Sequence, residues 1–158
     1  MSLFNPSRDE VREFFFNAWS QYQAQKPLTD LEKIALSVMH LHPEYHAILS
    51  APEQFKHQEY FPEFGETNPF LHMSLHLSIL EQISINQPIG ISGIYEQLKL
   101  KYQTEHDVEH QALHAILECL GEAIWQAQRN YTALDANFYV QLLQQKVGIN
   151  KHGNSKHA

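Results

Sequence analysis

Histidine is the residue type in this chain whose number and spacing point to chemistry. Eleven of the 158 residues are histidine, as many as lysine and arginine together. Several of them repeat at a spacing of four, which places their side chains on one side of a helix. The repeated pairs are His72 with His76, His110 with His114, and His42 with His46. Because imidazole is a common metal ligand, the first hypothesis is a metal site.

The pair His72 and His76 lies in the apolar stretch "NPFLHMSLHLSILEQI". At about 100° per residue the two directions differ by about 40° and straddle the direction of the apolar Ile83. Both histidines are therefore expected to face the core. An imidazole nitrogen buried without a partner costs about 1–3 kcal/mol. The pattern predicts that other groups bind these nitrogens.

The second pair belongs to a longer series at the same spacing. Its members are His106, His110, His114 and Glu118. Each step of four residues advances the direction by about 40°, so at most two neighbours in the series can share one metal ion. We expect His106 and His110 inside the apolar face of their helix and His114 at its edge.

A metal site is predicted where His72 and His76 of one helix meet His110 or His114 of another. Pro43 disturbs the helical spacing of the third pair. The full set of candidate ligands is His72, His76, His110, His114, Glu118, His42 and His46. Imidazole and carboxylate ligands without thiolate suit zinc, iron, nickel or manganese and do not choose among these divalent metals.

Two functions remain open from the residues alone. A site with an open position would activate water or bind a small substrate of unknown identity, with Glu118 or Glu122 as base, as in a hydrolase or transferase. Alternatively, the chain is a non-catalytic interaction protein or homodimer whose core histidines form structural hydrogen bonds. The residue pattern leaves open whether the protein is an enzyme.

Composition restricts the classes of partner and compartment. The net charge is −7 and the eleven basic residues are scattered, so nucleic acid is not an expected partner. No run of about 18 apolar residues and no signal-peptide pattern occur, which predicts a cytoplasmic protein without a membrane partner. Cys119 is the one cysteine, so an intrachain disulfide is excluded. Its apolar surroundings predict a packed, unreactive thiol.

Helix signals recur along the chain and strand signals do not. Ser7 with Glu10 and Thr29 with Glu32 match the capping-box pattern at helix starts. Asn68 and Thr104 are further expected caps. The predicted helices cover about 8–25, 30–41, 69–84, 92–102, 105–130 and 136–147, with short helical pieces near 43–50 and 52–58.

This order of elements predicts an all-α protein. The expected architecture is a helical bundle of four or more main helices with short helical connections. We expect a single domain over residues 1–147. Residues 148–158 are polar and aperiodic, which predicts a disordered tail whose His152 and His157 take no part in chemistry.

Five segments in the same order resemble an uncharacterised bacterial family, domain of unknown function 1841. They are "FNPSRDEVREFF", "HPEYH", "GETNPFLHMSLH", "QPIGI" and "ECLGEAIWQAQR". The resemblance covers roughly residues 4 to 130. It implies a small helical cytoplasmic protein and brings no particular activity with it.

Overall fold

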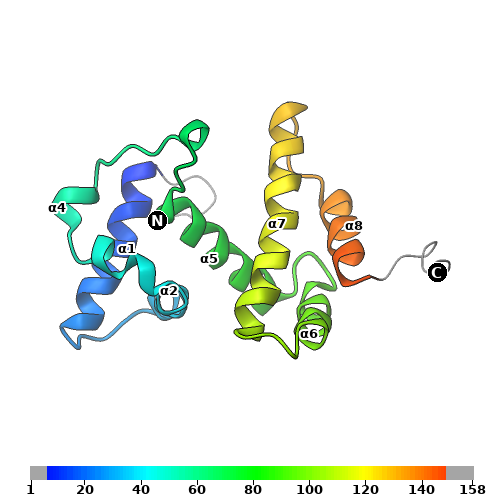
Figure 1. Cartoon of the computed structure of the whole chain (residues 1–158), viewed down its shortest axis with the longest axis horizontal. Helices are drawn as coiled ribbons and strands as arrows, with labels where there is room; N and C mark the ends of the chain where they lie inside the picture. The colour runs from blue at the N-terminus through cyan, green and yellow to red at the C-terminus, as the bar shows by residue number, and fades with distance from the viewer. Residues whose placement is uncertain (1–6, 149–158) are drawn as a thin grey trace. The chain divides into compact units, whose positions relative to one another are not determined.

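The computed structural model describes residues 7–148, and this part of the chain is helical (Figure 1). Its α-helices are α1 (Arg8–Gln23), α2 (Asp30–His40), α3 (His46–Leu49), α4 (Pro52–Phe55), α5 (Pro69–Ile85), α6 (Ile91–Lys101), α7 (Val108–Arg129) and α8 (Ala136–Val147). Two 3-10 helices, η1 (Pro43–Tyr45) and η2 (Pro62–Phe64), lie between them. Residues 7–148 contain no strand, so the predicted all-α class is confirmed.

Side-chain caps fix the starts of three long helices where the sequence predicted them. The Ser7 hydroxyl accepts from the Glu10 amide and the Glu10 carboxylate accepts from the Ser7 amide, and Thr29 and Glu32 form the same box. The Asn68 side-chain oxygen accepts from the amides two and three residues further on. Each cap contributes about 1 kcal/mol to stability.

The start of α7 differs from the prediction. Asp107 adopts a left-handed conformation with φ 54° and ψ 56°, so the helix begins at Val108. The expected cap at Thr104 is therefore wrong. His106 is exposed and precedes the helix, which also makes its predicted position inside the apolar face wrong. The helical histidine series starts at His110.

The chain divides into two compact units within α5. The first unit is Met1–Ser78 and the second is Ile79–Ala158. The prediction of one domain over residues 1–147 stays a prediction. Apart from Gly148, the expected tail lies outside the described residues, and so do its two histidines.

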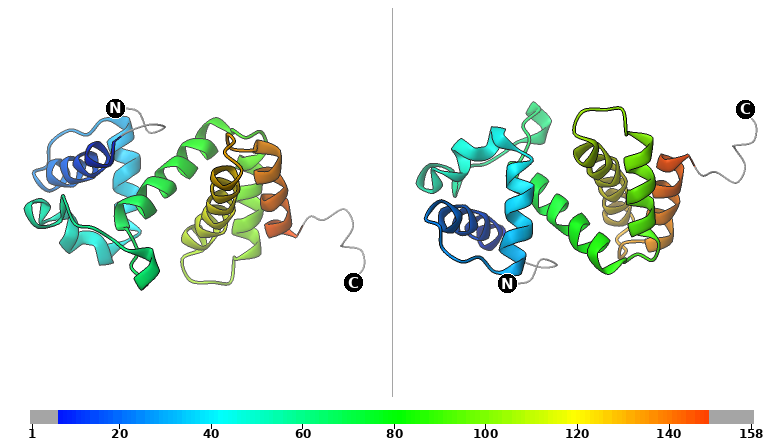
Figure 2. Two further views of the ribbon diagram at one scale, coloured as in Figure 1. Left: turned by 90° about the horizontal axis from the view of Figure 1, so that it is seen from above. Right: turned by 90° about the horizontal axis from the view of Figure 1, so that it is seen from below.

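In the first unit, α1 packs against α2 and α3. Figure 2 shows α1 and α2 as neighbours. The Phe16 and Phe70 rings meet edge to face with centroids 5.3 Å apart, which joins α1 to the start of α5. Other buried members of this core are Phe15, Trp19, Val38, Met39 and Leu49.

In the second unit, α6, α7 and α8 pack on one another. Figure 1 shows α7 and α8 side by side and running in opposite directions. The Tyr139 hydroxyl of α8 donates to the Gln82 side-chain oxygen at 2.8 Å, so α8 also holds the end of α5. Buried apolar residues of this core include Ile94, Leu98, Ile116, Leu120 and Leu143.

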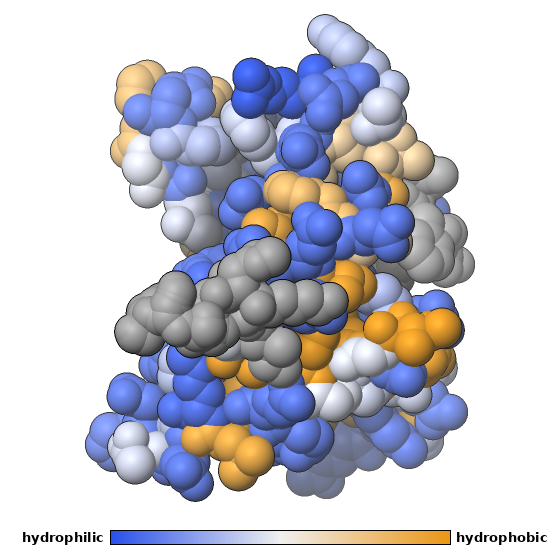
Figure 3. All heavy atoms as spheres, turned by 90° about the vertical axis from the view of Figure 1, so that its right-hand side faces the viewer, coloured by the Kyte–Doolittle hydropathy of each residue, from blue (hydrophilic) through white to orange (hydrophobic). Residues whose placement is uncertain are grey.

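The surface in Figure 3 is mainly hydrophilic, with hydrophobic residues among the polar ones. Large exposed apolar side chains of the second unit include Ile89, Leu100 and Trp125. Exposed apolar residues of this kind are ordinary on folded proteins. None of the helices described here combines the length and the apolar composition that a membrane span requires.

Cys119 provides a test of the packing in the second unit. It is buried on α7, and burial raises the pKa of its thiol to about 11. At pH 8 only about 0.1% of a thiol with that pKa is ionised, against about a quarter of an ordinary cysteine. We predict that iodoacetamide labels the native protein at least about 100-fold more slowly than the urea-unfolded chain.

The rate of labelling at Cys119 should depend on pH in a defined direction. Since the thiolate is the reactive form, the native labelling rate should rise about tenfold per pH unit from pH 8 to 10. The unfolded chain should level off near pH 9 because its thiol is then mostly ionised. Equal labelling rates for native and unfolded protein would contradict the packed position of Cys119.

Candidate functional site

His42 is held in one orientation by the end of α2. It lies two residues after the end of α2 and is buried, with 1% of its surface exposed. Its Nδ1 lies 2.9 Å from the Val38 carbonyl oxygen. A carbonyl oxygen only accepts, so Nδ1 carries the hydrogen, and a neutral His42 has its lone pair on Nε2.

His72 and His76 meet His42 inside the first unit. They lie one turn apart on α5, where His76 is fully buried and His72 is half-buried. The His72 and His76 rings, and the His42 and His76 rings, have centroids 4.8 Å apart. His42 Nε2 and His72 Nε2 are separated by 3.0 Å. We refer to His42, His72 and His76 as the histidine group.

The spacing of these nitrogens is compatible with the spacing of metal ligands. Two imidazole nitrogens on one zinc ion, each about 2.0–2.1 Å from it, lie about 3.3 Å apart in a tetrahedral site. Neighbouring corners of an octahedral site place them about 3.0 Å apart. His42 and His72 are at 3.0 Å, and the ligand nitrogens of His42 and His76 lie within 4.8 Å.

The hydrogen bond of His42 has the form found behind metal-bound histidines. A ligand imidazole usually donates its second N–H to a backbone carbonyl or carboxylate, which fixes the tautomer and the ring plane. The Val38 carbonyl provides this acceptor for His42. The fold thus directs Nε2 of His42 toward α5 without any contribution from a metal.

Tyr45 forms one wall of the histidine group. Its ring stacks on His42 with centroids 5.3 Å apart and planes 5° apart. Burial raises the pKa of Tyr45, since the phenolate is poorly solvated there. The hydroxyl therefore stays protonated at neutral pH and can act as a hydrogen-bond donor.

His46 is separated from His42, although the sequence paired them. Its Nε2 donates to the Met39 carbonyl at 2.8 Å, and its ring lies against Trp19 with centroids 4.5 Å apart. Pro43 starts η1 between the two histidines, so their side chains take different directions. His42 joins the histidine group and His46 joins an aromatic cluster.

His110 and His114 form a pair within the second unit. They are half-buried neighbours one turn apart on α7. Their Nε2 atoms are 3.0 Å apart, and their rings meet edge to face with centroids at 4.2 Å. The separation of this pair equals that of neighbouring ligands in an octahedral site.

The carboxylates predicted for the site lie at the surface. Glu118 is exposed and pairs with Lys146 of α8 at 2.6 Å. The hydrogen bond from Lys146 to Glu118 raises the pKa of the lysine. Glu122, predicted as an alternative base, is also exposed.

One buried charged residue was missed by the sequence reasoning. Arg12 is 2% exposed, and it is the one arginine or lysine that is buried in residues 7–148. The signal was present, because Arg12 precedes Phe15, Phe16 and Trp19 at the spacings of three, four and seven that mark one helix face.

The hydrogen bond of His42 predicts a single tautomer. In metal-free protein at about pH 8, long-range ¹H–¹⁵N correlation spectra should show His42 with a protonated Nδ1. A free imidazole in water favours the opposite tautomer, so exposed His106 provides the matched comparison. A protonated Nε2 with a bare Nδ1 on His42 would contradict the orientation set by Val38.

Comparisons with known proteins identify the family. The family model described as Domain of unknown function (DUF1841) matches residues 7–145, a range that includes both the histidine group and the His110–His114 pair. No curated protein and no solved structure matches the chain. The resemblance noted from five sequence segments is confirmed, and the chain belongs to the DUF1841 family.

Proposed function

We propose that this protein binds a divalent transition metal through the histidine group. The observation that carries the proposal is the 3.0 Å separation of His42 Nε2 and His72 Nε2, with His42 fixed from behind by the Val38 carbonyl. His76 adds a third imidazole, one turn further along α5 than His72. Imidazole ligands without thiolate suit zinc, iron, nickel or manganese.

One metal ion can bind three imidazoles at the same time, whereas three imidazoles cannot all satisfy one another by hydrogen bonds. A hydrogen bond between two rings needs a proton on one nitrogen and a lone pair on the other. A divalent ion instead accepts a lone pair from every ring at once. It also offsets the cost of placing polar rings among residues such as Met73 and Leu77, which are fully buried.

The finer proposal is hydrolytic or group-transfer chemistry. Three protein ligands leave a coordination position for water or a small substrate, and a bound metal lowers the pKa of that water. Tyr45 lies beside His42 and has a protonated hydroxyl, so it is a candidate donor to a group at the open position. The predicted sharing of one ion with His110 or His114 stays a prediction.

The alternative is an interaction protein or homodimer whose histidines are structural. Hydrogen bonds from His42 to Val38 and from His46 to Met39 favour it, because each satisfies a ring nitrogen without metal. In that case metal would neither bind specifically nor stabilise the fold. A measurement of metal binding therefore distinguishes the metal-binding function from the structural one.

Metal content and affinity test the proposal on untagged full-length protein. We predict near-stoichiometric zinc, iron, nickel or manganese by mass spectrometry after desalting, and saturable uptake by chelator-treated protein. At a free metal concentration 100-fold above the dissociation constant, binding should stabilise the fold by about 2.7 kcal/mol, read as a rise in melting temperature. His72→Ala and His76→Ala should each weaken binding at least about tenfold.

The controls separate a site from general histidine binding. His106→Ala removes an exposed histidine and should leave affinity unchanged. His110→Ala and His114→Ala report whether that pair supplies ligands to the same ion. Circular dichroism of each variant shows that it is folded. Equal affinity in the parent and in His72→Ala/His76→Ala, or no saturable uptake by the parent, would overturn the proposal.

A further inference from the structure

Arg12 is a buried cation whose guanidinium is only partly bonded. Its Nη1 donates to the carbonyls of Phe55 and Lys56 at 3.0 and 3.2 Å, and Cζ lies 4.8 Å from the centre of the Phe70 ring. Its Nε is buried without a hydrogen-bond partner in the described chain, and so is the hydroxyl of Tyr60 next to it. Two neighbouring buried donors, Arg12 Nε and the Tyr60 hydroxyl, therefore lack a hydrogen-bond acceptor in the described chain.

The unused edge of Arg12 has the shape that recognises a carboxylate. Nη1 is occupied by the two carbonyls, whereas Nε is buried and unsatisfied and Nη2 forms no hydrogen bond within residues 7–148. No aspartate or glutamate of this range forms an ion pair with Arg12. Two parallel N–H groups of a guanidinium bind one carboxylate in bidentate fashion.

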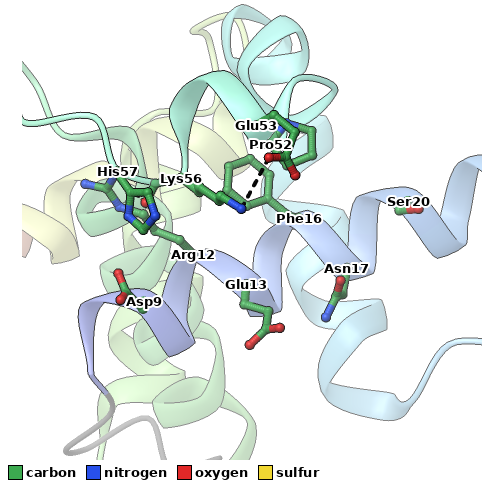
Figure 4. A pocket seen from close by; sticks show the side chains of 10 residues that line it. All are labelled: Asp9, Arg12, Glu13, Phe16, Asn17, Ser20, Pro52, Glu53, Lys56 and His57. Carbon is green, nitrogen blue, oxygen red and sulfur yellow. Dashed lines mark hydrogen bonds and ion pairs between the residues drawn. The ribbon is translucent and has the colours of Figure 1, made fainter.

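Arg12 lines a cavity in the first unit of about 460 Å³. Figure 4 shows the cavity between α1 and the segment around α4, with Arg12 beside His57. Pockets for small molecules begin at about 300 Å³, so this volume suits a small metabolite. Desolvation by burial and the nearby cation Arg8 both lower the pKa of Arg12, which means that an anion beside it would be stabilised.

The other charges of the cavity select the kind of ligand. Lys56 is already paired with Glu53 at 3.3 Å, as the dashed line in Figure 4 marks. Asp9 and Glu13 extend from α1 and form no ion pair within residues 7–148. A phosphate dianion would be attracted by Arg12 and repelled by both carboxylates. A ligand with one carboxylate and one ammonium satisfies both signs.

We propose that this cavity binds a free amino acid. Its carboxylate is held by Arg12, and its ammonium is held by Asp9 and Glu13. Asn17 and Ser20 line the same cavity and supply neutral polar groups for a side chain. The proposal uses none of the residues in the histidine group, so metal binding and amino-acid binding can be tested separately.

Calorimetric titration of the full chain tests this proposal, with each common amino acid as probe. At least one should bind saturably. Its deaminated acid and its decarboxylated amine should each bind at least about tenfold more weakly, because each lacks one charge, and inorganic phosphate should not compete. Asp9→Asn/Glu13→Gln should weaken binding at least about tenfold, whereas Glu63→Gln, an exposed carboxylate outside the cavity, should not.

Arg12→Lys keeps the charge and removes the bidentate edge. This substitution should weaken the binding of the amino acid more than the binding of the decarboxylated amine. The melting temperature of the variant shows that it is folded. If Arg12→Lys does not fold, the Asp9→Asn/Glu13→Gln variant still tests the proposal. No saturable binding by any amino acid, equal binding of the deaminated acid, or an unchanged affinity in Asp9→Asn/Glu13→Gln would overturn the proposal.

Discussion

The rest of the site depends on one hydrogen bond, from His42 Nδ1 to the Val38 carbonyl. A buried imidazole must satisfy two nitrogens, and this bond satisfies one of them with the last turn of α2. The other nitrogen is then directed at His72 of α5. The tautomer of His42 and the proposed metal chemistry both follow from this arrangement.

The buried polar side chains of the described residues are concentrated in the first unit. They are Arg12, His42 and His76. Buried polar groups cost stability unless they are bonded, so their presence in one small core requires local partners or ligands. The second unit is held instead by apolar contacts among α6, α7 and α8 and by the bond between Tyr139 and Gln82.

Local signals in the sequence predicted most of the fold. Capping residues such as Ser7 and Thr29 mark helix starts because their hydroxyls satisfy free amides, a short-range effect that pattern alone reveals. The start of α7 was missed because it depends on the left-handed backbone of Asp107, which no residue pattern required.

The candidate site was predictable only in part, for a physical reason. Helical periodicity indicated that His76 faces inward, and the structure buries it. The separation of His42 from His46 depends on how the chain turns at Pro43, which spacing does not describe. Arg12 was overlooked because a charged residue on an apolar face is usually at its border, whereas here two backbone carbonyls hold it inside.

The most direct test of the central claim is X-ray absorption spectroscopy at the metal edge of untagged protein loaded with one equivalent of metal. We predict at least three imidazole ligands with metal–nitrogen distances of about 2.0–2.1 Å for zinc, and fewer in His72→Ala. A first shell of oxygen alone, or a spectrum unchanged by His72→Ala, would contradict a metal site built on His42, His72 and His76.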